Sequence, residues 1–363
     1  MSVSGDYGIV NQIEFQGRSF AGASVSNYGV VQTGDVVYTK SPLNSDPYGI
    51  IKTNKGKPGI VSTLYAVYHP KENAFSDFIQ VYFEQHARMN NYMHPLVNKG
   101  AKNDMKVSAE NALKGPVCFP SRIEQESISA FFSVLDNLIT LHQRKFEKLT
   151  NVKKSMLEKM FPQNGSSYPE IRFKGFTDPW EQRKLGEIGS VSMCRRIFKE
   201  QTSETGEIPF YKIGTFGAEP DAFISRGLFE EYKSKYPYPK KGDILISASG
   251  SIGRTVEFSG NNEYFQDSNI VWLSHDERLS NSFLKCFYSV VKWAGIEGST
   301  IKRLYNDNIL NTVIFMPSVP EQERIGLFFE NLDYLITLHQ RKPFLMKWRT
   351  SDANRNQTNR LVL

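Results

Sequence analysis

The sequence is poor in the residues that build metal sites and covalent crosslinks. Its three cysteines, Cys118, Cys194 and Cys286, are odd in number and far apart, and no C-x-x-C pair occurs. This pattern excludes a disulfide framework and argues against a zinc site. The six histidines are scattered, and none stands four residues from another. We therefore expect buried free thiols, no metal and no cofactor.

Long apolar runs are also missing. No stretch reaches about eighteen apolar residues, and no basic-then-apolar leader opens the chain. We therefore expect no membrane span, no membrane partner and a cytoplasmic location. The net charge of +6 permits nucleic-acid binding without requiring it, and a length of 363 residues predicts two or three domains.

The sequence does contain a long internal repeat. The first copy, PSRIEQESISAFFSVLDNLITLHQRK, covers residues 120–145, and the second, PSVPEQERIGLFFENLDYLITLHQRK, covers residues 317–342. Most positions are identical without gaps, which chance does not produce over about twenty-six residues. The chain is therefore a tandem duplication, and each copy of the repeat closes one half.

Each copy of the repeat is predicted to form a helix, because its apolar residues recur three or four positions apart. No Gly or Pro occurs between Ser121 and Phe161, so the first helix could span about forty residues, or roughly 60 Å. Two such helices in one chain favour a coiled-coil pair. We expect His142 and His339, which are equivalent, to form a buried polar contact that sets the helix register. The residues expected to pack the pair are Phe131, Leu135, Leu138 and His142, and Phe328, Leu332, Leu335 and His339.

The two halves also correspond outside the helices. In the first half, β-rich runs at 30–40 and 59–70 precede one amphipathic helix expected over 75–93. In the second half, strands are expected within 239–258 and 265–274, before a helix at 280–295. The predicted fold class is therefore α/β (α+β), with two homologous mixed domains separated by two long helices. The predicted segments are a first domain (1–119), a first helix (120–161), a connector (162–180), a second domain (181–316), a second helix (317–345) and a divergent tail (346–363).

Both ends depart from the repeat. The first half has no equivalent of the segment WEQRKLGEIGSV, which follows the connector, so the first domain is expected to be shortened at its N-terminal side. Pro343 removes a helical N–H and is expected to stop the second helix. A frameshift or recombination junction near Lys342 would explain why similarity ends there.

The duplicated motif EQ-x-x-I-x-x-F-F-x-x-L-D-x-L-I-T-L-H-Q-R-K, with the connector PEIRFKGFTDPWEQRKLGEIGS, resembles the specificity subunits of type I restriction–modification systems. The resemblance extends over about residues 1–345. It implies two target recognition domains that each read one part of a gapped, bipartite target in double-stranded DNA, with the two helices forming an antiparallel coiled coil as spacer. It also implies binding of two modification (methyltransferase) subunits, assembly with restriction subunits, and no catalytic site in this chain.

Base reading and phosphate contacts favour loops that mix basic residues with Asn, Ser and Tyr. Four stretches have that composition: 299–308, its counterpart 98–106, 247–254 and 40–57. The candidate DNA-binding residues in them are Lys302, Arg303 and Asn306, then Ser249, Ser251 and Arg254, and in the first half Lys102, Asn103 and Lys106. A solvated surface loop is the alternative for each.

Two other functions remain as alternatives. Asp221, Glu231 and Lys233 fit the short P-D…E-x-K pattern of magnesium-dependent nucleases, although residues 229–235 lack the alternation of a strand. The chain could also be a coiled-coil partner-binding protein, a defective or phase-variable remnant. Of the three functions, only that of a DNA-specificity subunit requires two similar readers and a rigid spacer.

Overall fold

The computed structural model describes residues 1–19, 24–40, 46–97, 107–163, 165–293 and 303–346. The chain divides into two compact units. The first consists of Met1–Arg144 with the end of the last helix from His339, and the second is Lys145–Leu338. Within the described ranges, no helix is both long and apolar enough to cross a bilayer.

The first unit is built on small antiparallel sheets. A three-stranded sheet has the order β5-β4-β7, and two further pairs join β1 to β2 and β3 to β6. The central strand β4 is buried along its whole length, as its apolar run predicts. The strands are β1 (Ser2–Ser4), β2 (Gly8–Val10), β3 (Gly29–Val31), β4 (Val36–Thr39), β5 (Ile51–Thr53), β6 (Gly59–Val61) and β7 (Tyr65–Tyr68).

The single helix expected over 75–93 is wrong, because two helices occupy this stretch. α2 (Ser76–Phe83) and α3 (His86–Met93) are separated where Gln85 adopts an extended conformation. At the break, the Glu84 carboxylate accepts a 3.1 Å hydrogen bond from Lys52 on β5. The break lets each helix bury its own apolar side. The remaining short helices are α1 (Gln12–Gln16), η1 (His94–Leu96) and η2 (Asn111–Leu113).

The second unit contains a four-stranded antiparallel sheet in the order β13-β12-β15-β9. Successive residues of a strand point to opposite faces, and here both faces are covered. Ile244 and Ile246 belong to one hydrophobic core, whereas Leu245 and Trp272 belong to a second. The central strands therefore lie between two cores.

The other strands of the second unit form smaller sheets. β10 lies between β11 and β14, and β8 pairs with β16. The strands are β8 (Glu181–Lys184), β9 (Gly189–Ser192), β10 (Ile208–Tyr211), β11 (Phe223–Ile224), β12 (Ile244–Ser247), β13 (Thr255–Glu257), β14 (Tyr264–Phe265), β15 (Ile270–His275) and β16 (Val313–Met316). The shorter helices are η3 (Leu185–Glu187), η4 (Lys199–Gln201), α5 (Arg226–Lys235), α6 (Asn281–Val290) and α7 (Asn306–Leu310).

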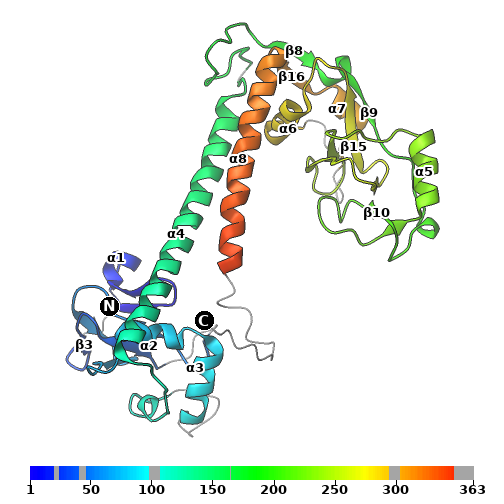
Figure 1. Ribbon diagram of the computed structural model, residues 1–363. Helices are drawn as coiled ribbons and strands as arrows, with labels where there is room; N and C mark the ends of the chain where they lie inside the picture. The colour runs from blue at the N-terminus through cyan, green and yellow to red at the C-terminus, as the bar shows by residue number, and fades with distance from the viewer. Residues whose placement is uncertain (20–23, 41–45, 98–106, 164, 294–302, 347–363) are drawn as a thin grey trace. The chain divides into compact units, whose positions relative to one another are not determined.

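Two long helices contribute to both units. α4 (Arg122–Lys159) has 38 residues and confirms the first predicted helix. α8 (Val319–Met346) has 28 residues and continues past Pro343, so the predicted stop at that proline is wrong. A proline removes one backbone N–H, and the neighbouring turns of a helix keep their own hydrogen bonds. Within the second unit, α8 and the C-terminal part of α4 run side by side in opposite directions (Figure 1).

Contacts between the helices agree only in part with the expected packing. His142 Nδ1 lies 2.9 Å from His339 Nδ1, so these two side chains meet as expected. Farther along, Lys153 donates a 2.5 Å hydrogen bond to Asp333. In the second copy, Leu332 is buried in a core and Phe328 packs against it, and in the first copy Leu135 is half-buried. Phe131, Leu138 and Leu335 are 61%, 39% and 40% exposed, and their packing in the helix pair stays a prediction.

Both long helices begin with the same buried glutamine. The Gln125 amide donates to the carbonyls of Asn73 and Pro120 and accepts from the N–H of Phe75, next to α2. Gln322 makes the equivalent three bonds to Arg278, Pro317 and Ser280, next to α6. The duplication therefore includes the joint between each domain and its helix.

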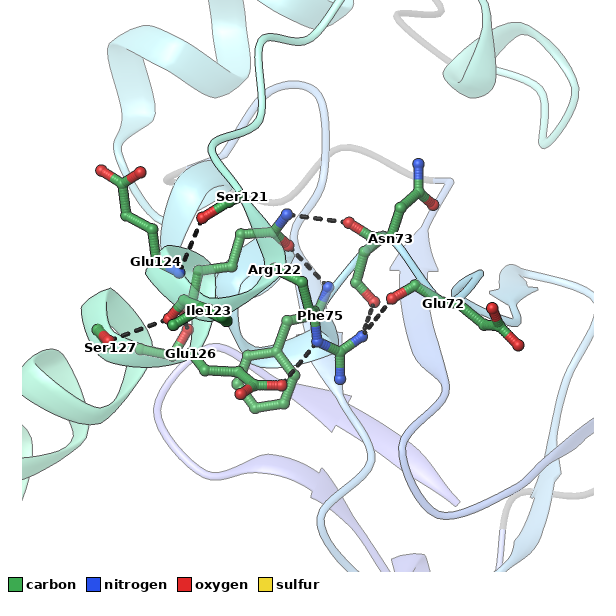
Figure 2. A network of polar contacts seen from close by, with 12 residues as sticks. Glu72, Asn73, Phe75, Ser121, Arg122, Ile123, Glu124, Glu126 and Ser127 are labelled. Atoms are coloured by element: carbon green, nitrogen blue, oxygen red, sulfur yellow. Dashed lines mark hydrogen bonds and ion pairs between the residues drawn. The ribbon is translucent and has the colours of Figure 1, made fainter.

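In the first half, Arg122 strengthens that joint. It donates to the carbonyls of Glu72 and Ala74, forms an ion pair with Glu126, and lies over the Phe75 ring (Figure 2). The start of α4 is therefore fixed to the loop that precedes α2.

The cysteines differ in burial. Cys194 and Cys286 are buried, as expected, but Cys118 is exposed. Cys118 follows no periodic pattern and stands two residues before Pro120, in a stretch without regular secondary structure. The expectation of a buried thiol is therefore wrong at this position.

Candidate nucleic-acid interface

Three loops of the second unit meet at Asn269. The Ser249 hydroxyl donates a 2.7 Å hydrogen bond to Asn269 Oδ1, and Arg303 Nη2 donates a 3.1 Å bond to the same oxygen. Ser249 and Arg303 also form an isolated antiparallel bridge. Two candidate residues 54 positions apart in the sequence are therefore neighbours, and we call Ser249, Asn269 and Arg303 the Asn269 cluster.

Backbone bonds hold this cluster in place. The N–H of Leu304 donates to the Ala248 carbonyl at 2.8 Å, and the N–H of Ala248 donates to the Asn269 carbonyl at 2.7 Å. Ser249 is 6% exposed, so its hydroxyl serves to position Asn269. Arg303 is half-buried and reaches the cluster from the stretch just before α7.

The loop between β12 and β13 is shaped by glycines. Gly250 and Gly253 have φ values of 66° and 82°, in the region that L-residues rarely adopt. A Cβ added to Gly253 would lie 2.9 Å from Nε1 of Trp293. Inside the loop, the Ser247 hydroxyl donates to the Ser251 carbonyl and accepts from the Arg254 N–H. The conformation of this loop is thus fixed by backbone groups and the buried Ser247 side chain, without the exposed side chains.

Of the candidate residues in this region, Ser251, Arg254 and Asn306 are exposed. Arg254 Nη2 makes a 3.4 Å contact with the Gly217 carbonyl. Within the part of the chain that the structure describes, neither Arg254 nor Arg303 forms an ion pair with a carboxylate. Both guanidinium groups can therefore donate hydrogen bonds to an external acceptor, such as a phosphate oxygen or a purine edge.

Asn306 is the first residue of α7, whereas we expected a loop. The preceding residue, Tyr305, is 49% exposed and donates its N–H to the Asn308 side chain at 3.0 Å. A helix that begins here presents an amide and an aromatic ring from one turn. Such side chains can read base edges or stack on a base.

Asn269, which joins the two candidate loops, was not among the residues predicted from the sequence. The predicted strand started at 265, but β15 begins at Ile270, and Ser268 has a φ of 52°. The run Asp-Ser-Asn is typical of a turn and could have revealed this loop. Lys302, Lys102, Asn103 and Lys106 lie outside the described residues, so the structure does not place them.

The three residues of the nuclease alternative have separate partners. Asp221 pairs with Lys212 at 2.9 Å, and Glu231 pairs with Lys235 on the same helix. Lys233 lies 5.0 Å from the centre of the Phe229 ring. Within the described ranges, no group of three or more His, Cys, Asp or Glu side chains could hold a metal ion.

The second half of the chain is similar to a known protein family. Residues 177–344 match the family model of the type I restriction modification DNA specificity domain. A relative from Haemophilus influenzae, assigned as a type I restriction enzyme specificity subunit, is 59% identical over 153 residues, which are 42% of this chain and 40% of that protein. The match therefore spans well under half of that relative's length.

More distant relatives cover more of the chain. The type I restriction enzyme MjaIX specificity subunit of Methanocaldococcus jannaschii is 22% identical over 335 residues, 86% of this chain and 72% of that protein. The crystal structure of a type I restriction–modification S subunit from M. genitalium superposes with a TM-score of 0.54 at 14% identity, covering 89% of this chain and 82% of that one. The last comparison concerns the fold alone.

Proposed function

We propose that this chain, whose residues 177–344 match the type I restriction modification DNA specificity domain, selects the DNA target of such a system. Each domain would read one part of a gapped, bipartite target in double-stranded DNA. The chain would act as a non-catalytic subunit in the cytoplasm, and methylation and cleavage would belong to its partner subunits.

The Asn269 cluster is the observation that carries this proposal. Its three side chains come from separate loops, and one amide oxygen holds an arginine that has no carboxylate partner in the described chain. A guanidinium held at one end by a neutral amide keeps its charge and its remaining N–H groups for DNA. The arrangement thus orients Arg303 without neutralising it.

The candidate residues divide by the contact each would make. Arg254, exposed beside the glycine-rich loop, would contact a phosphate and set the position of the domain on the duplex. Arg303 and Asn306 would face base edges in the major groove, where arginine pairs with guanine and asparagine with adenine. Ser249 would position Asn269, and Ser251 would contact the backbone of DNA. Lys302, and Lys102, Asn103 and Lys106 in the first half, remain candidates for phosphate contacts.

Equivalent exposed apolar residues on the two helices support the binding of two identical partners. Leu138 and Leu141 on α4 are 39% and 60% exposed, and their counterparts Leu335 and Leu338 on α8 are 40% and 37% exposed. Exposed apolar surface of this kind marks interaction sites, and a repeated surface fits two copies of one partner. We propose two modification subunits as these partners, with restriction subunits joining the complex.

Methylation mapping tests the proposed function. The chain is expressed with a modification subunit of its own system in a host without DNA methylation, and methyladenine is located across the genome by single-molecule sequencing. We expect a gapped, two-part motif. Arg303→Ala should change or abolish only the part read by the second domain, whereas Arg226→Ala, an exposed arginine paired with Glu207, should leave the motif unchanged.

Three other outcomes would contradict the proposed function or the role of the Asn269 cluster in it. Absence of methylation while both proteins co-purify would replace the proposed function with that of a partner-binding, target-blind protein. Magnesium-dependent cleavage by the isolated chain, lost in Glu231→Ala, would instead support the nuclease alternative. A motif that survives Arg303→Ala intact would remove the Asn269 cluster from DNA reading.

A further inference from the structure

In the second half, the connector covers the start of α8. Arg172 donates two hydrogen bonds, of 2.7 and 2.8 Å, to the two carboxylate oxygens of Glu321, which is 1% exposed. The next connector residue, Phe173, lies edge-on to Phe328 with ring centres 5.9 Å apart, and the Arg324 guanidinium lies over the Phe173 ring. These two consecutive connector residues therefore contact Glu321 and Phe328 of α8, which are seven positions apart on one helix face.

The chain that follows the connector completes this cover. Trp180 is 2% exposed and packs edge-on to Phe283 of α6, with ring centres 5.7 Å apart. The next residues form β8, which pairs antiparallel with β16 from Met316 opposite Glu181 to Val313 opposite Lys184. Residues 172–184 thus supply an ion-pair partner for Glu321, an aromatic partner for Phe328 and a strand that pairs with β16.

The first half has the same positions, but they are uncovered. By the repeat, Glu124 is equivalent to Glu321, and Phe131 is equivalent to Phe328. The Glu124 side chain is exposed and forms no ion pair within the described part of the chain, and Phe131 is 61% exposed. Figure 2 shows the Glu124 carboxylate directed away from the network around Arg122.

The segment of the first half that is equivalent to β16, residues 116–119, also lacks a partner strand among the described residues. Cys118 is exposed and Phe119 is 37% exposed. Phe78, the equivalent of Phe283, contacts Phe119 at 5.3 Å, where Phe283 contacts a tryptophan. Pro116 offers no N–H, which removes one hydrogen bond at the end of a possible strand pair and leaves the others.

We propose that Glu124, Phe131 and residues 116–119, together the open face, bind a segment of a separate polypeptide that has the chemistry of residues 171–184. That segment would place an arginine on Glu124 and the following aromatic residue on Phe131. Its continuation would add as an antiparallel strand to residues 116–119, a mode in which main-chain bonds supply affinity and side-chain pockets supply specificity. The proposal rests on the comparison of the two halves and is independent of DNA binding.

A synthetic peptide with the sequence of residues 169–184, PEIRFKGFTDPWEQRK, tests the proposal. The labelled peptide is titrated with the full chain, and fluorescence anisotropy is recorded. We expect saturable binding, weakened at least about tenfold when the peptide carries Arg172→Glu, because a like charge then faces Glu124. The chain variant Glu124→Arg should reject the original peptide and bind the charge-reversed peptide. Glu147→Arg, an equal charge change elsewhere on α4, should behave as the unaltered chain.

The thiol of Cys118 provides a second readout. Because Cys118 is exposed within residues 116–119 of the open face, bound peptide should slow its alkylation, and the charge-reversed peptide should not. Absence of saturable binding would overturn the proposal. Binding that ignores the charge reversal, or that leaves Cys118 fully reactive, would also overturn it, since the peptide would then sit elsewhere, for example in place of the connector at Glu321.

Discussion

Arg172 and Glu321 form a bidentate ion pair that is almost entirely removed from solvent. The guanidinium is 15% exposed and the carboxylate 1% exposed. The hydrogen bonds to Glu321 raise the pKa of Arg172, so its guanidinium stays protonated. Because the two residues are 149 positions apart, this one contact fixes the connector to the start of α8.

Removing one partner of this pair should be costly. We expect Arg172→Ala to lower the free energy of unfolding of the second unit by about 3–5 kcal/mol, since it leaves a buried carboxylate uncompensated. Urea unfolding followed by tryptophan fluorescence measures the loss, because Trp180 lies in the same segment. Arg183→Ala is the control: its pair with Glu181 is exposed, at 45% and 70%, and should cost at most about 1 kcal/mol. Equal losses in the two variants would contradict a special role for the buried pair.

The buried glutamines should act locally and in parallel. Gln125→Ala leaves two carbonyls and one N–H without their side-chain partner in the first unit, and Gln322→Ala does the same in the second. Each change should cost about 1–3 kcal/mol. Hydrogen exchange should speed up at the amide of Phe75 only in the first variant and at that of Ser280 only in the second. Faster exchange at both amides in either single variant would mean that the two joints are not independent.

The same joints show what the sequence could predict. Apolar spacing and the lack of Gly or Pro over residues 122–159 were enough for α4. The break at Glu84 carries no such signal, because it depends on Lys52 from a distant strand. The local spacing of apolar residues cannot reveal a hydrogen-bond partner that lies 32 positions away in the sequence.

The contacts of the Asn269 cluster also depend on residues that are distant in the sequence. Composition identified Ser249 and Arg303 separately, as members of polar, basic loops. Their contact through Asn269 is a product of strand order, since β12 and β15 must lie side by side before the two loops meet. Exposure of Phe131 was likewise unpredictable from the helix alone, because its counterpart Phe328 is in contact with Phe173 of the connector.

Asn269 should control how Arg303 is presented to DNA. We expect Asn269→Ala to release the guanidinium and reduce discrimination in the second half of the target, at about 1–3 kcal/mol for the affected base pair. Asn269→Asp should instead weaken binding to all sequences, because a carboxylate beside Arg303 neutralises its charge and repels phosphates. Competition binding on the mapped target and on single-base variants separates these effects. Identical profiles for the two variants would show that Asn269 only supports the loop.

The three thiols should differ sharply in reactivity. Burial raises the pKa of Cys194 and of Cys286 to about 12. At pH 8, only about one thiol in ten thousand at these sites would be ionised, and the thiolate is the reactive form. Cys118 is exposed, so an alkylating reagent should modify one thiol per folded chain, and peptide mass spectrometry should assign it to Cys118. The other two should react only after unfolding, at a rate that follows urea concentration. Rapid modification of Cys286 in the native protein would contradict the packing of α6 against α4 and α8 within the second unit.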